Sequence, residues 1–239
     1  MMISRIVFWH LDGRICKLAT RRESGVNPYT RKNVLKCVSE ALKTPEPVIC
    51  FMHWNFELEK YPQPYDRQLA MDVIDMGVSA VIGCHAHRVQ PVEFYKGRPI
   101  VYGLGNFLFC QGHYFSGQLR FPKFCEKEYA FEMINGGEKF KLHHFHYDSE
   151  NNNLEYVKSE EVGAGVDFDG KAEFTGFSTK EYEKWFRKHR VQKKLLPVFI
   201  ANEPIFSYAA KSYWIKVRGK LVNLLTKLNL KSANRAHRK

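Results

Sequence analysis

The sequence lacks the features that define several common classes of protein. Its six cysteines are scattered without a C-x-x-C pair, which argues against a thiolate zinc cluster or a thioredoxin-type redox motif. Its first apolar run is interrupted at His10 and Asp12, too early for a signal peptide or a membrane-spanning helix. We therefore expect most cysteines to be buried and reduced, and the protein to be cytoplasmic or peripheral at the membrane.

Acidic residues are missing from the end of the chain. No Asp or Glu follows Glu203, whereas nine of the 37 basic residues do. Residues 1–203 therefore have 28 basic and 25 acidic residues, and they contribute only +3 to the net charge of +12. Because the positive charge belongs to the tail, the body has no charge signature of a nucleic-acid-binding domain, and we expect no nucleic-acid partner.

Apolar patterning predicts an α/β core in the first half of the 239-residue chain. Short apolar runs at 47–54 and 78–83 are typical of buried strands, and the segment between them, 65–77, has helical spacing and ends at Gly77. A hairpin is expected over 91–105. Strand, helix, strand and hairpin in this order indicate parallel strands joined by a helical crossover.

The second half has a different pattern. Three alternating segments separated by Asn- and Gly-rich turns predict a β-meander, and a capped helix follows it. The expected strands cover 128–134, 139–147 and 153–162, and the expected helix covers 179–192, with Ser178 as its N-cap and Glu181 three residues on.

Two histidines follow the predicted strand at 78–83. Alternation along an extended chain would bring His85 and His87 to the same side, and His53 ends the neighbouring predicted strand. Ends of adjacent parallel strands open into a shared crevice where ligands bind. Three neutral imidazoles suit zinc, or manganese and iron with added oxygen ligands. A single H-x-H pattern is common, however, and hydrogen-bonded structural histidines are the alternative.

Other polar groups have simpler interpretations. The second H-x-H, within 143–146, lies in a meander strand without a partner motif, so we interpret its histidines as surface and core residues. The aspartates of the 65–77 segment are expected to face solvent; they are Asp66, Asp72 and Asp75.

Four motifs follow one another between residues 53 and 109. They are His53-Trp54-Asn55-Phe56-Glu57, Gln68 to Ala70, Gly83 to Pro91, and Tyr102 to Phe107. In order and spacing they resemble the HWG-x-E, Q-x-x-A, G-x-H-P-H-x-x-Q-P and Y-S-L-G-N-F motifs of the CapA family, the bacterial capsule and poly-gamma-glutamate synthesis proteins. Members of that family have a calcineurin-like metallophosphoesterase fold.

This resemblance implies roles for six residues. His53, His85 and His87 would be metal ligands, and Glu57, Gln90 and Asn106 would line or support the site. Asn55 stands where the family has glycine, and asparagine tolerates the left-handed backbone that glycine adopts.

The family's G-D, N-L-E and N-H motifs, which supply further metal ligands and a proton donor, are not found ahead of His53. The resemblance therefore implies the C-terminal half of a CapA-type domain at 1–165, a linking helix region at 166–203 and a basic tail at 204–239. The expected fold class is α/β, a partial metallophosphoesterase-like sandwich of β-sheets flanked by helices, with C-terminal helices.

Two functions remain open. The first is a metal-dependent, hydrolase-like protein of capsule or poly-gamma-glutamate production, whose divalent metal is weakly bound because no bridging carboxylate is evident. No catalytic residue is assigned. The alternative is a noncatalytic remnant or accessory subunit that associates with a membrane surface or with a partner chain supplying the missing motifs.

The basic tail has an amphipathic pattern from Tyr213 to Leu230. Apolar residues with an interfacial Trp214 fall on one helical face and lysines on others, as in helices that bind anionic membrane surfaces or dock on partners. A helix packed on the core is the alternative. Nucleic acid is disfavoured because no stacking platform accompanies the charge.

Overall fold

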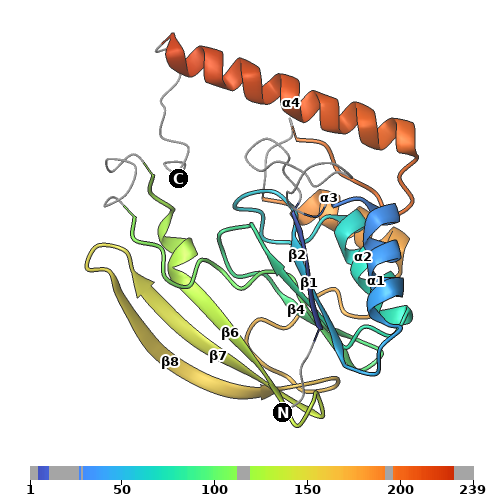
Figure 1. Ribbon diagram of the computed structural model, residues 1–239. Coiled ribbons are helices and arrows are strands. Elements are labelled where there is room, and N and C mark those ends of the chain that lie inside the picture. The colour runs from blue at the N-terminus through green and yellow to red at the C-terminus, as the bar shows by residue number, and fades with distance from the viewer. Residues whose placement is uncertain (1–4, 11–26, 28, 112–118, 192–195, 229–239) are drawn as a thin grey trace.

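The computed structural model describes residues 5–10, 27, 29–111, 119–191 and 196–228 of the chain (Figure 1). A five-stranded sheet has the order β1-β2-β3-β5-β4, and all neighbours are parallel except the pair of β4 and β5. Its strands are β1 (Arg5–His10), β2 (Val48–His53), β3 (Ala80–Cys84), β4 (Val92–Tyr95) and β5 (Arg98–Val101).

A second sheet is an antiparallel meander of order β6-β7-β8, and four α-helices complete the described fold. These strands are β6 (Lys127–Ile134), β7 (Lys139–Asp148) and β8 (Asn153–Val162), and a 3-10 helix at Lys123–Glu126 precedes them. The helices are α1 (Arg31–Ala41), α2 (Pro64–Asp75), α3 (Thr179–His189) and α4 (Ile205–Lys227).

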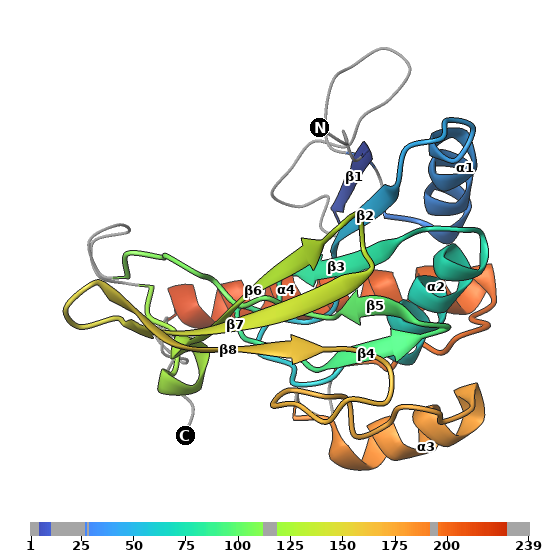
Figure 2. The same ribbon diagram turned by 90° about the horizontal axis from the view of Figure 1, so that it is seen from below.

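The five-stranded sheet is covered on both faces. Figure 2 shows the meander lying across β3, β5 and β4, while α1 and α2 lie on the other side of the sheet. Each face has its own apolar core, one built with α1, α2 and α3 and the other with the meander. The predicted α/β class with β-sheets flanked by helices is confirmed, and the arrangement is consistent with a partial metallophosphoesterase-like fold.

Local sequence signals account for most of these elements. Pro64 occupies the first turn of α2, where a missing N–H costs nothing, and Leu69 and Val73 are fully buried. The expected capping box of α3 is present between Ser178 and Glu181. Helix α1 was not predicted, although its N-cap Thr30 accepts a hydrogen bond from a backbone N–H as such caps do.

None of the helices in the described residues combines the length and apolarity needed to cross a bilayer.

Candidate metal centre

His53 lies at the carboxyl edge of the parallel strands. It is the last residue of β2, paired in register with Cys84, the last residue of β3. The Cys84 Sγ lies 3.4 Å from the His53 Nδ1, and burial raises the pKa of the Cys84 thiol to about 11. Cys84 is therefore a neutral thiol at neutral pH, and it contributes no thiolate to this edge.

His85 and His87 follow β3 on a sharply turned backbone. Their φ angles are 96° and 54°, both in the left-handed region that residues with a Cβ rarely adopt. The sequence predicted that the two side chains lie on the same side because the chain is extended there. That reason is wrong, because β3 ends at Cys84 and the backbone turns at His85 and His87. Strained backbone of this kind is kept where the surrounding structure enforces it, commonly at functional sites.

The turn nevertheless brings the imidazoles together. The ring centroids of His53 and His85 lie 4.4 Å apart, and those of His85 and His87 lie 5.8 Å apart. Two imidazoles on one tetrahedral zinc have centroids about 5 Å apart, since each Zn–N bond is about 2 Å. The pair of His53 and His85 thus has the donor type and spacing for one shared cation.

A complete ligand shell is not preassembled. Across the parts of the chain that the structure describes, no three His, Cys, Asp or Glu side chains are placed so that together they hold a metal ion. The described residues therefore offer two nitrogen ligands for one cation, from the pair His53 and His85. They do not fit a bridged two-metal centre, which needs an oxygen ligand between the ions.

Asn106 fixes the orientation of His87. Its Oδ1 lies 2.7 Å from the His87 Nδ1, and its Nδ2 donates to the His87 carbonyl oxygen at 3.3 Å. Because the amide nitrogen must face the carbonyl, the amide oxygen faces the ring, and the Nδ1 carries the proton. The Nε2 of His87 is then the nitrogen with a lone pair, the form that a metal requires.

Glu128, at the start of β6, was missed by sequence reasoning. An oxygen of its fully buried carboxyl group accepts the backbone N–H of Asn106 at 2.5 Å and that of Phe107 at 2.8 Å. The meander sheet therefore holds the segment that orients His87. Nothing distinguishes this glutamate in sequence from others in alternating strands, because the contact joins residues 22 positions apart.

Glu128 makes stability depend on pH. Burial raises the pKa of its carboxyl to about 8, even though the two backbone hydrogen bonds lower it. The folded state thus holds this proton more tightly than the unfolded chain, so the contribution of Glu128 is fully present at low pH and is lost as pH rises toward 8. We expect the wild type to lose roughly 3 kcal/mol of unfolding free energy from this group between pH 5.5 and 8.

Urea unfolding at pH 5.5 and 8 tests this expectation, with Glu128→Gln losing that part of the pH dependence. Asp66 acts in the same direction, because burial raises the pKa of its carboxyl to about 7. The variant Asp66→Asn is therefore the matched control, since it should retain the contribution of Glu128. An unchanged slope in Glu128→Gln would contradict the assignment.

The burial of Asp66 corrects the expectation that the helix aspartates face solvent. Asp66 is only 4% exposed, and its Oδ1 accepts a hydrogen bond from the Tyr29 hydroxyl at 2.8 Å. It also accepts a backbone hydrogen bond from Asn55, two residues after His53. Asn55 has the anticipated left-handed backbone, with φ 71°. Asp66 therefore stabilises the loop that follows His53. We call the carboxyl edge of the sheet, with His53, His85 and His87, the histidine edge.

Gln90 and Glu57, the other two residues predicted to line or support the site, differ in burial. Gln90 is buried, and its Nε2 donates to the Glu59 carbonyl oxygen at 2.8 Å, tying the loop after β2 to the segment before β4. Glu57 is exposed on that same loop. Gln90 thus supports the histidine edge by joining two of its loops, rather than by lining the site.

The second histidine motif forms part of the meander. The His143 Nε2 lies 3.0 Å from a carboxylate oxygen of Glu132, and His144 is buried beside Glu160. These contacts match the interpretation as surface and core histidines.

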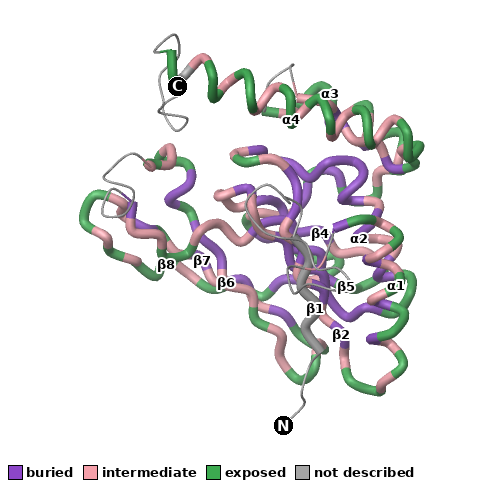
Figure 3. The backbone as a smooth tube through the Cα atoms, turned by 45° about the horizontal axis from the view of Figure 1, so that its top comes forward, coloured by how far each residue is buried: buried purple, intermediate pink, exposed green. Residues whose placement is uncertain are grey.

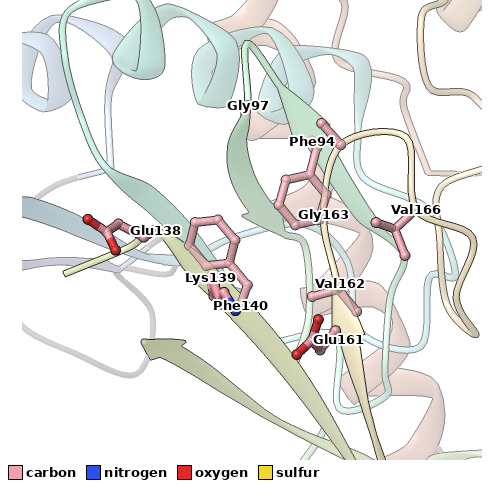
Figure 4. Close-up of a pocket in the computed structure, with 10 residues that line it drawn as sticks. Phe94, Gly97, Glu138, Lys139, Phe140, Glu161, Val162, Gly163 and Val166 are labelled. Atoms are coloured by element: carbon pink, nitrogen blue, oxygen red, sulfur yellow. The ribbon is translucent and has the colours of Figure 1, made fainter. Parts of the chain in front are cut away.

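A pocket of about 230 Å³ opens between the two sheets, at the turn joining β4 and β5 (Figure 4). Apolar side chains of Phe94, Phe140, Val162 and Val166 line it. The turn precedes β5, which runs parallel to β3, so the pocket lies at the end of the sheet opposite the histidines.

Comparison with known proteins supports the resemblance of residues 13–111 to one protein family. Residues 13–111 match the family described as "Bacterial capsule synthesis protein PGA_cap", and this range contains the three histidines, Gln90 and Asn106. The resemblance to the CapA family is confirmed over this part of the chain. The matched range therefore contains the whole histidine edge, whereas Glu128 and α4 lie outside it.

Individual similar proteins are named for the same process. The chain is 37% identical over 94 residues to "PGA biosynthesis protein CapA" of Bacillus subtilis, covering 39% of this chain and 25% of the relative. It is 34% identical over 100 residues to "Capsule biosynthesis protein CapA" of Bacillus anthracis, covering 40% and 24%. A "Probable polyglutamine synthesis accessory protein" of Mycobacterium tuberculosis is 38% identical over 58 residues, covering 24% and 15%. The chain thus spans about a quarter of the length of the first two relatives.

Proposed function

We propose that this protein acts in the production of capsule or poly-gamma-glutamate and that its histidine edge binds one divalent cation. The observation that carries the proposal is the approach of His53 and His85 to a centroid distance of 4.4 Å at the carboxyl edge of the sheet. The names of the relatives support the process, and the nitrogen donors support an ion of the zinc, manganese or iron class.

The chemistry available to such a site is limited. A bound cation would act as a Lewis acid or would lower the pKa of a bound water. The protein's own residues orient the ligands: Asn106 holds the proton on the His87 Nδ1, and Glu128 fixes the backbone of Asn106. No residue is assigned as proton donor. The hydrolase-like activity implied by the metallophosphoesterase resemblance is therefore proposed only with groups added from another chain.

The alternative is a noncatalytic accessory protein. It is favoured by the finding that no group of three or more potential ligands is preassembled in the described residues. In that case the edge would be completed by a partner chain, or the histidines would serve only the packing of the loops.

Zinc titration of the full chain, followed by calorimetry and elemental analysis, tests the proposal. We expect one weakly bound ion per chain in the wild type and at least a 10-fold loss of affinity in His85→Ala/His87→Ala, because ligand nitrogens are removed. The control His143→Ala/His146→Ala removes the same number of imidazoles from β7 and should bind like the wild type. Equal binding by all three proteins would refute the metal site and leave the accessory function.

A further inference from the structure

Helix α4 extends beyond the body of the protein. Figure 1 shows it running across the top of the molecule, apart from both sheets. Its first two turns are fastened by Tyr208, whose ring packs on Tyr65 and Phe199 at 5.4 and 5.0 Å. Lys211 adds an ion pair of 2.6 Å to Glu203. The remaining 16 residues extend about 24 Å further at 1.5 Å per residue.

The exposed side of α4 carries an apolar stripe. Spaced at 100° per residue from Phe206 onward, its large exposed apolar side chains fall within a sector of about 100°, and only Ile205, at the first position of the described helix, lies outside that sector. They include Tyr213 at 69% exposed, Leu221 at 54%, Leu224 at 53% and Leu228 at 57%, together with Phe206, Trp214 and Val217. The half-buried positions Ile215, Gly219 and Val222 lie on the opposite side. Figure 3 shows the same alternation of exposed and partly buried backbone along the helix.

This arrangement bears on the alternative of a helix packed on the core. Such a helix would bury its leucines and present its cations to solvent. In α4, Leu221, Leu224 and Leu228 are each more than half exposed, so the apolar stripe faces away from the body.

Basic residues border the stripe on both sides. Lys216, Lys220 and Lys227 follow one edge, and Arg218 lies beyond the other. No acidic residue occurs between position 204 and the last residue of the sequence. A second copy of this chain would bring like charges together along the same stripe, which opposes self-association. An anionic surface with an apolar interior matches both the charge and the leucines.

We propose that α4 docks on an anionic lipid surface, lying parallel to it with Trp214 and the leucine stripe inserted at headgroup depth. Phe56, on the loop after β2, packs against Phe199 with ring centroids 6.3 Å apart, and Phe199 packs against Tyr208 of α4. Docking therefore holds the histidine edge beside the membrane. This inference does not depend on metal binding.

Co-sedimentation of the full chain with vesicles tests the docking. Vesicles of phosphatidylglycerol and phosphatidylcholine are compared with phosphatidylcholine alone, at 0.1 M and 1 M salt. The wild type should partition onto the anionic vesicles at low salt and be released at high salt, where the Debye length falls from about 10 to about 3 Å. Leu221→Glu/Leu224→Glu should lower the partition coefficient at least 10-fold, because two buried leucines are replaced by anions.

Two further variants separate the contribution of the leucines from that of the lysines and from a nonspecific effect of added negative charge. Tyr156→Glu/Val157→Glu makes the same charge change at exposed positions of β8, 61% and 58% exposed, and should bind like the wild type. Lys216→Gln/Lys220→Gln/Lys227→Gln keeps the leucines and should lower the partition coefficient roughly 100-fold, at about fivefold per lysine. Circular dichroism verifies that each variant is folded. Equal binding to neutral vesicles, no loss in the Leu221→Glu/Leu224→Glu variant, or an α4-dependent dimer without vesicle binding would each overturn the proposal.

Discussion

Replacing Arg67 by methionine is expected to lower the free energy of unfolding by about 3 to 5 kcal/mol. Arg67, on α2, makes a bidentate ion pair with Glu93 of β4, with distances of 3.0 and 2.7 Å, and both side chains are at most 3% exposed. The Tyr102 hydroxyl donates to the same carboxylate at 2.7 Å. Methionine fills the volume but leaves the Glu93 carboxylate buried without its cation, and that uncompensated charge is the source of the cost.

Urea denaturation at neutral pH measures this effect. The control is Arg98→Met, the same substitution at an exposed position of β5, which should change stability by less than about 0.5 kcal/mol. The double variant Arg67→Met/Glu93→Gln removes both charges and should recover part of the loss. A loss below about 1 kcal/mol in Arg67→Met would mean that the carboxylate finds another partner or takes up a proton.

Gly105→Ala is expected to destabilise the fold and also to disturb the histidine edge. Gly105 has φ 94°, and a Cβ there would overlap the carboxylate of Glu128. The left-handed backbone alone costs an alanine about 1 to 2 kcal/mol, and displacing Glu128 adds to it. The hydrogen bonds from Asn106 and Phe107 would be lost together, so the support of His87 goes with them.

Gly97→Ala separates the two contributions. Gly97 also has a left-handed backbone, with φ 74°, but nothing lies within 4 Å of the Cβ position. Gly105→Ala should therefore cost roughly 2 kcal/mol more than Gly97→Ala. It alone should shift the NMR signals of the His87 ring. Equal losses in the two variants, with unchanged His87 signals, would contradict the role of Glu128.

Most elements of the fold were predictable because their signals are local. The apolar runs around β2 and β3 and the capping residues of α3 specify structure within a few positions. The same is true of Asn55, whose left-handed backbone followed from a single residue type. Helix α1 was missed because its stability depends on packing Val34 and Val38 into the core rather than on a strong pattern.

The candidate site was only partly predictable. The motif spacing located His53, His85, His87 and Asn106, and the comparisons support the family over that range. The solvent-facing placement of Asp66 was wrong, because a helix position does not reveal that Tyr29 and the loop at Asn55 cover it. The role of Glu128 could not be predicted, since it arises only when the meander packs beside the first sheet.

The sequence by itself determined the α/β pattern, the histidine motif and the separation of a nearly neutral body from a basic tail. These properties depend on residue types and short spacings, which survive without knowledge of the fold. Tertiary structure decided which carboxylates are buried, how His87 is held, and that the leucine stripe of α4 faces outward. Such properties depend on contacts between residues far apart in the chain, because burial and hydrogen-bond partners are set by the packing of whole elements against one another.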